Sequence, residues 1–210
     1  MLNTLNRQVG ASLVELMISM TLGLASMTAM ASLVGHGIAL NNQLLEKSRL
    51  DEEINAVLAV LSQDLQRAGY HASTANMVGT PLTFNSAFHA QTIRLSEYPS
   101  ETTDSCITFA YDRNQNGLLD TVNTNENYGY RLKNKAIEMR QSGLSCLANK
   151  WQDLSDPKVV HITDLSFSKQ VLNSQQLKHV RIHVSLTANL VRNPDLSRSV
   201  RTSFSIKNYE

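Results

Sequence analysis

The sequence lacks a large excess of positive or negative charge. Its 210 residues contain 19 Lys and Arg against 18 Asp and Glu, which gives a formal net charge of +1. This balance excludes a strongly basic nucleic-acid binder and an acidic solvating tail. A nucleophile motif, a glycine-rich phosphate loop and a paired-histidine metal site are also absent, and the six histidines are scattered. The sequence therefore predicts neither an enzyme nor a nucleic-acid-binding protein.

Charged side chains are missing from Leu16 to Gly35, a run of 20 residues that also lacks histidine. A helix of that length spans roughly 30 Å, the hydrocarbon thickness of a bilayer. Arg7 and the initiator amine favour a cytoplasmic N-terminus, and no comparable apolar run follows. We therefore expect one membrane-spanning helix in the inner membrane, with everything after about residue 41 on its far, periplasmic side.

Two simpler interpretations of this run stay open. It can be a plain membrane anchor, or it can be a secretory signal cleaved after the small-x-small triplet Ala29-Met30-Ala31, before Ser32. The run is long for a signal peptide, and the helical pattern continues beyond it, which favours a retained helix.

Glu15 stands at the front edge of the apolar run, shortly after Gly10 and Ala11. The segment RQVGASLVELMISMTLGL resembles the leader junction of type IV prepilins and type II secretion pseudopilins. The resemblance implies that prepilin peptidase cleaves after Gly10 and methylates the new N-terminus at Ala11. It also implies that the Glu15 carboxylate pairs with an N-terminal amine in the filament core, where an unpaired charge is costly.

Proline is absent before Pro81, so no residue forces the helix to end at the membrane surface. Gly69 is suited to a helix C-cap, which predicts one helix from about Ser12 to Ala68. In its second half, one apolar stripe repeats at helical spacing: Leu50, Ile54, Val57, Leu58, Leu61 and Leu65. We interpret this stripe as packing against a globular domain.

Runs typical of strands follow an irregular connection over residues 71–91. We expect strands at Thr92–Ser96, Cys106–Tyr111, Tyr128–Leu132, Ala136–Arg140, Val159–Phe167, His179–Leu190 and Ser199–Ile206. The predicted fold class is α+β, a long N-terminal helix packed on an antiparallel sheet. We expect four segments: a leader (1–10), the membrane or filament-core half of the helix (11–40), its amphipathic half (41–70) and a β-rich globular domain (71–210).

Cysteine is scarce, and the two residues present are Cys106 and Cys146. No CxxC motif or zinc-ligand spacing is present. Outside the cytoplasm two such residues most simply form one disulfide.

One loop has the pattern of a cation site. Oxygen-bearing side chains occupy positions 1, 3, 5 and 9 of a calcium-type loop, namely Asp112, Asn114, Asn116 and Asp120. Gly117 occupies position 6, where such loops turn sharply. Position 12 departs from the pattern, since Asn123 replaces the usual glutamate, although Glu126 lies nearby. Two interpretations stay open: a weak calcium site, or a polar hairpin loop in which Asn116-Gly117 makes the turn.

The blocks CITFAYDRNQNG, NYGYRLKNKAIEMR and LSCLANKWQDLSDPKVVHITDLSF, together with SRLDEEINAVLAVLSQDLQRAGY, resemble PilW-type minor pilins. The resemblance implies assembly of a type IV pilus, in a tip complex that primes the fibre, while adhesion, motility and DNA uptake all stay open as the role of that pilus. Its partners would be other minor pilins, the major pilin, prepilin peptidase and the inner-membrane assembly platform. Trp151 and the LSDP turn look structural. The alternatives are a J-like minor pseudopilin of type II secretion and an anchored periplasmic binding module.

Overall fold

The computed structural model describes residues 12–72, 93–174 and 177–206, with side chains placed up to residue 172 and again from 180. The chain forms two units, Met1–Glu46 and Lys47–Glu210. One α-helix, α1 (Leu13–Arg67), contributes to both units. The predicted cleavage and methylation residues, Gly10 and Ala11, lie outside the described residues, as does most of the predicted 71–91 connection.

In the second unit, α1 buries one stripe of side chains: Leu50, Ile54, Val57, Leu61 and Leu65. Their spacing of three and four residues places them on one face of the helix. The helix ends at Arg67, and Gly69 follows with φ of 76°, a conformation that costs glycine little. Its N–H donates to the Ala110 carbonyl oxygen at 2.8 Å, so the helix end is attached to the sheet.

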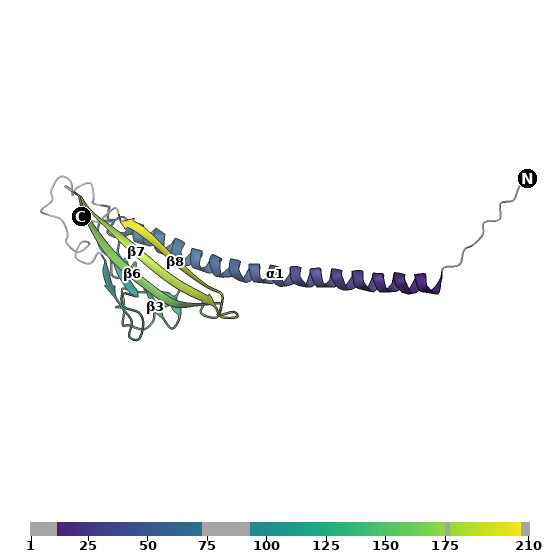
Figure 1. Cartoon of the computed structure of the whole chain (residues 1–210). Coiled ribbons are helices and arrows are strands. Elements are labelled where there is room, and N and C mark those ends of the chain that lie inside the picture. The colour runs from purple at the N-terminus through teal and green to yellow at the C-terminus, as the bar shows by residue number, and fades with distance from the viewer. Residues whose placement is uncertain (1–11, 73–92, 175–176, 207–210) are drawn as a thin grey trace, which may run out of the picture. The chain divides into compact units, whose positions relative to one another are not determined.

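Two antiparallel sheets complete this unit (Figure 1). The five-stranded sheet has the order β1-β2-β3-β4-β5, and the three-stranded sheet has the order β6-β7-β8. The bounds are β1 (Arg94–Ser96), β2 (Cys106–Ala110), β3 (Asn127–Lys133), β4 (Ala136–Met139), β5 (Gln152–Asp153), β6 (Val160–Ser174), β7 (Leu177–Leu190) and β8 (Ser197–Ile206). The predicted α+β class is confirmed.

The core lies between the buried stripe of α1 and the inner faces of the sheets. In β7 the buried side chains alternate with more exposed ones, which gives this strand one core face and one wet face. The buried members are Val180, Ile182, Val184, Leu186, Ala188 and Leu190. The Phe167 N–H of β6 donates to the carbonyl oxygen of Asp104, in the segment between β1 and β2, at 3.0 Å.

Two sequence-based strand predictions are corrected. The predicted strand ending at Phe167 continues to Ser174. Residues 168–174 lack alternating apolar side chains, but they form a strand because they pair with β7. The predicted set omits β5, whose two residues pair with Glu138 and Met139 of β4. Both differences come from long-range pairing that local periodicity does not encode.

Candidate functional sites

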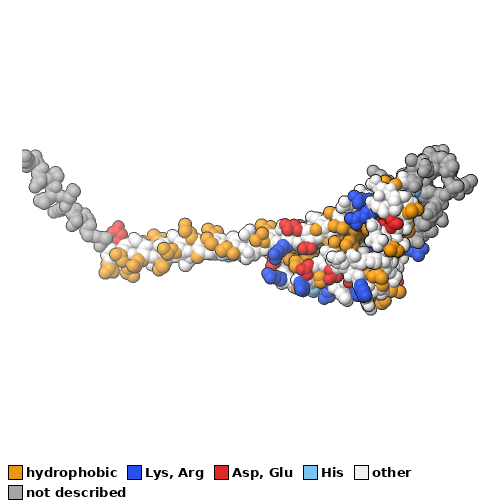
Figure 2. Space-filling view, turned by 180° about the vertical axis from the view of Figure 1, so that it is seen from behind, with side chains coloured by type: hydrophobic (Ala, Val, Ile, Leu, Met, Phe, Trp, Pro, Cys, Tyr) orange, Lys and Arg blue, Asp and Glu red, His pale blue; other side chains and the backbone are white. Residues whose placement is uncertain are grey.

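The described part of the first unit is a helix with an apolar surface (Figure 2). Its large apolar side chains, from Leu13 to Leu45, are 54–75% exposed. Soluble monomers rarely leave apolar patches of more than a few hundred Å² uncovered. Of the helices in the described residues, α1 alone is long and apolar enough to cross a membrane. This surface therefore suits lipid or the apolar helices of other subunits.

Four hydroxyl side chains in the apolar run form hydrogen bonds within the helix. The Ser19 hydroxyl donates to the Glu15 carbonyl oxygen at 2.7 Å, and the Ser26 hydroxyl donates to that of Leu22 at 2.8 Å. Thr21 and Thr28 make the same kind of bond to carbonyl oxygens three residues back. Such local bonds allow hydroxyl groups to lie in an apolar environment without an unpaired donor.

Three glycines of this segment are not required by packing within the described chain. A Cβ atom added to Gly23, Gly35 or Gly37 would meet no atom within 4 Å. Small residues on an apolar helix allow another helix to approach closely. Glycine here is therefore compatible with close packing against a neighbouring helix.

Glu15 lies in the first turn of α1 and is exposed. At this end of a helix, backbone N–H groups without helical partners and the helix dipole favour a negative charge. Among the described residues, Glu15 is the one acidic residue of the helix before Glu46. Its carboxylate thus stands alone at one end of a long uncharged surface.

A disulfide joins Cys106 of β2 to Cys146, with the two Cα atoms 6.3 Å apart. Arg131, fully buried in β3, lies opposite Cys106 in the register. Its guanidinium group forms an ion pair with Glu138 at 2.6 Å and donates to the carbonyl oxygens of Cys146 and Ala148. These groups hold the segment after β4 against the sheet.

Two aromatic rings enclose the same guanidinium group. Its central carbon lies 4.4 Å from the Trp151 ring centroid and 4.9 Å from that of Tyr98. Trp151 is 8% exposed, and its indole N–H donates to the Ser145 carbonyl oxygen. In the LSDP turn, the Ser155 hydroxyl accepts the Ile137 N–H. These contacts fit structural roles for Trp151 and the turn.

The loop after β2 brings the four predicted calcium ligands together. Asp112 accepts the N–H groups of Asn116 and Gly117, at 3.2 and 2.8 Å. The side-chain amides of Asn114 and Asn116 both donate to the same Asp120 oxygen, at 2.6 and 2.9 Å. Gly117 has φ of 78°, as the sharp turn requires.

The loop also depends on Glu126, which is fully buried. Its carboxylate accepts backbone N–H groups from Arg113, Asn114 and Asp120, at 2.7, 3.2 and 3.0 Å. The loop thus folds around two carboxylates that backbone donors already satisfy. No group of three His, Cys, Asp or Glu residues arranged to hold a metal ion occurs among the described residues.

Calcium binding by this loop stays a prediction, and a melting experiment tests it. With a dissociation constant of about 1 mM, 10 mM calcium stabilises the folded chain by about 1.4 kcal/mol. We expect the full chain in detergent to melt at a higher temperature in calcium than in equal magnesium, and Asp120→Asn to remove the difference. Equal melting temperatures would favour the polar-turn interpretation.

A tyrosine cluster surrounds Asp64 of α1. The Asp64 carboxylate accepts the hydroxyl groups of Tyr111 and Tyr130, at 3.1 and 2.5 Å. The rings of Tyr111 and Tyr128 stack with centroids 4.0 Å apart. Burial, followed by the Asp64 hydrogen bond, raises the pKa of Tyr130, and burial, followed by the Asp64 charge, raises that of Tyr111.

This cluster is not among the sites predicted from the sequence. Tyr128 and Tyr130 are two residues apart in β3, which places both on one face of the strand. That spacing could have indicated an aromatic face. The partner Asp64 lies more than 60 residues away along the chain.

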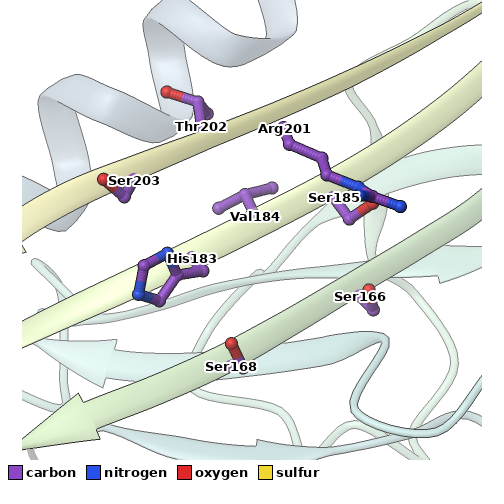
Figure 3. Close-up of a pocket in the computed structure, with 8 residues that line it drawn as sticks. All are labelled: Ser166, Ser168, His183, Val184, Ser185, Arg201, Thr202 and Ser203. Carbon is purple, nitrogen blue, oxygen red and sulfur yellow. The ribbon is translucent and has the colours of Figure 1, made fainter.

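A shallow hollow of about 310 Å³ lies on the face of the three-stranded sheet opposite the buried side chains of β7 (Figure 3). Matching strand positions supply its side chains: Ser166, Ser168, His183, Ser185, Arg201 and Ser203. Short hydroxyl side chains are typical of the wet face of an antiparallel sheet. We assign this hollow no separate function.

Residues 43–206 match the family model of prepilin peptidase-dependent protein B. The chain belongs to this family. The match lies entirely outside the leader and the apolar run, so it is independent of the Gly10 and Glu15 pattern. The protein is therefore pilin-like. This agrees with the general resemblance of its sequence to prepilins and pseudopilins, and it does not address the specific resemblance to PilW-type minor pilins.

Two known proteins are similar to this chain along most of its length. The prepilin peptidase-dependent protein B of Escherichia coli K12 is 23% identical over 169 residues, covering 78% of this chain and 79% of its own. An uncharacterised protein of Haemophilus influenzae is 24% identical over 185 residues, and the match covers 71% of this chain and 75% of that protein. No solved structure matches the chain.

Proposed function

We propose that the protein is a minor pilin, processed by prepilin peptidase after Gly10, that takes part in type IV pilus assembly, in a tip complex that primes the fibre. The observation that carries the proposal is the exposed apolar helix of the first unit, whose long uncharged surface ends at Glu15. The name of the family describes dependence on the same peptidase. PilW-type identity rests on the sequence blocks quoted above.

The proposed location is the inner membrane, with a periplasmic globular domain, and then the pilus. The Cys106–Cys146 disulfide supports an oxidising compartment for the globular unit. In the membrane the apolar helix lies among lipids, and in the fibre it packs against helices of other pilins. There Glu15 pairs with the methylated amine of Ala11, in the same or a neighbouring subunit, because both charges are then compensated.

The mass of the mature chain tests the processing step. In cells with active prepilin peptidase we expect the chain to begin at Ala11 and to carry one added methyl group. In cells with inactive peptidase the mass should include residues 1–10. A chain that begins at Met1 despite active peptidase would support a simple anchored module, and one that begins at Ser32 would support a secretory signal.

Glu15→Ala tests the assembly step in the same cells. We expect normal processing and an unchanged melting temperature, because Glu15 is exposed and outside the core. Incorporation into sheared pili should fall at least about tenfold, since an unpaired N-terminal charge in an apolar core costs several kcal/mol. Glu52→Ala, an exposed carboxylate later in α1, is the matched control. Equal incorporation of both variants would contradict the proposed role of Glu15.

A further inference from the structure

A polar hollow of about 450 Å³ opens in the globular unit beside the tyrosine cluster. Side chains from the end of α1, the loop before β3, and β3 and β4 with their flanking residues line it, and most of them are polar. A neighbouring hollow of about 490 Å³ shares Arg67, Tyr111 and Arg113 with it. Volumes of this order suit small ligands.

The charge in this hollow is unbalanced. Arg67, Arg113 and Arg140 line it together with one carboxylate, that of Asp64, while Asp112 lines the neighbouring hollow. Backbone N–H groups of Asn116 and Gly117 already satisfy the Asp112 carboxylate. Asp64 already accepts two tyrosine hydroxyl groups. The ion pairs of Arg131 with Glu138 and of Arg198 with Asp51 involve none of the three arginines of the hollow. An anion would complete the site.

Arg140 shows that part of this charge is built into the structure. Its guanidinium group donates to three carbonyl oxygens, those of Tyr128, Gly143 and Leu144. Burial lowers its pKa, because the loss of water around the guanidinium group disfavours its charged form. Arg67 and Arg113 are exposed and are therefore available for direct contact with a ligand.

The other side chains indicate which anion fits. Asn123, Asn125 and Asn127 line the hollow, and amide groups both donate and accept hydrogen bonds. A ligand with several hydroxyl groups can use both kinds of group. A guanidinium group binds a carboxylate through two parallel hydrogen bonds.

An extended peptide fits this place less well. Strands β3 and β4, which border the hollow, already have neighbours on both sides in the sheet order. Their backbone therefore offers no free edge for a peptide strand to extend.

We propose that the hollow binds an acidic sugar, a pyranose unit that carries a carboxylate. Arg113 and Arg67 contact the carboxylate, and the asparagines contact the hydroxyl groups.

Calorimetric titration of the unprocessed full chain, in a detergent without a sugar headgroup, tests this proposal. The probes are D-glucuronate, D-glucose and tetraglutamate. We expect glucuronate to bind with a dissociation constant in the millimolar range or below, and glucose to bind at least about tenfold more weakly, because it lacks the charge-assisted bonds. The titration does not depend on processing, so it can fail while the proposed pilin function holds.

Arg113→Gln should weaken glucuronate binding at least about tenfold. Arg192→Gln, which changes an exposed arginine between β7 and β8, should leave it unchanged. Equal melting temperatures of the two variants would show that folding is intact. Absence of glucuronate binding, or equal weakening in both variants, would overturn the proposal. Tighter binding of tetraglutamate would overturn the sugar assignment in favour of an acidic peptide.

Discussion

Arg131→Met is expected to destabilise the globular unit by about 3–5 kcal/mol, because it leaves the buried Glu138 without its cation. Methionine retains most of the apolar stem, so the lost groups are the charge and its hydrogen bonds. The carbonyl oxygens of Cys146 and Ala148 would lose their shared donor. Trp151 and Tyr98 would lose the cation between them.

Urea unfolding of the full chain in detergent at pH 7 measures this loss. Arg131→Met combined with Glu138→Leu should recover part of the stability, because the uncompensated buried charge is then removed. Arg198→Met is the matched control, since its ion pair with Asp51 is partly exposed and should contribute less than about 1 kcal/mol. A loss for Arg131→Met no larger than for Arg198→Met would show that Arg131 is not the central contact of this region.

Arg131 also shows where the sequence could not predict the fold. In β3, Tyr130 and Leu132 alternate with Arg131, a pattern that favours a wet position for the arginine. Arg131 is nevertheless buried, because the disulfide-linked segment with Trp151 covers that face of the sheet. Local alternation identifies two faces of a strand, but it does not show that a later segment covers the second one.

The α1 stripe was predictable because its information is local. Spacing alone places the six predicted leucine, isoleucine and valine residues on one face. Five of them are buried, and the sixth, Leu58, is half-buried against the core. Gly69 likewise has the positive φ that a C-cap requires. These features follow from residues within a few turns of each other.

The polar sites were predictable only in part, for the same reason. The spacing of Asp112, Asn114, Asn116 and Asp120 indicated that they gather in one loop, and hydrogen bonds join them there. It did not indicate that Glu126 is the buried acceptor of three backbone donors. The arginine-lined hollow forms where α1, the loop before β3 and the strand β4 come together. It can therefore be recognised only when the tertiary structure is known.

Alkaline pH is expected to destabilise the globular unit through Tyr111 and Tyr130. Burial and Asp64 raise the pKa of both hydroxyl groups in the folded chain, while in the unfolded chain they titrate near their ordinary value of about 10. Above that pH the unfolded chain loses protons that the folded chain keeps, so stability falls as pH rises. The contribution is fully present below about pH 10, and each tyrosine removes up to about 1.4 kcal/mol for every pH unit above it.

Urea unfolding at intervals between pH 8 and 11.5 measures this slope. Tyr130→Phe should be less stable than the unmodified chain at pH 8, because it removes the hydroxyl group that donates to Asp64. Its stability should nevertheless decline less steeply above pH 10, since one titrating group with a raised pKa is gone. Tyr111→Phe combined with Tyr130→Phe should flatten the slope further. An unchanged slope in the double variant would mean that other groups carry the alkaline instability and that Asp64 does not hold these two protons in the folded chain.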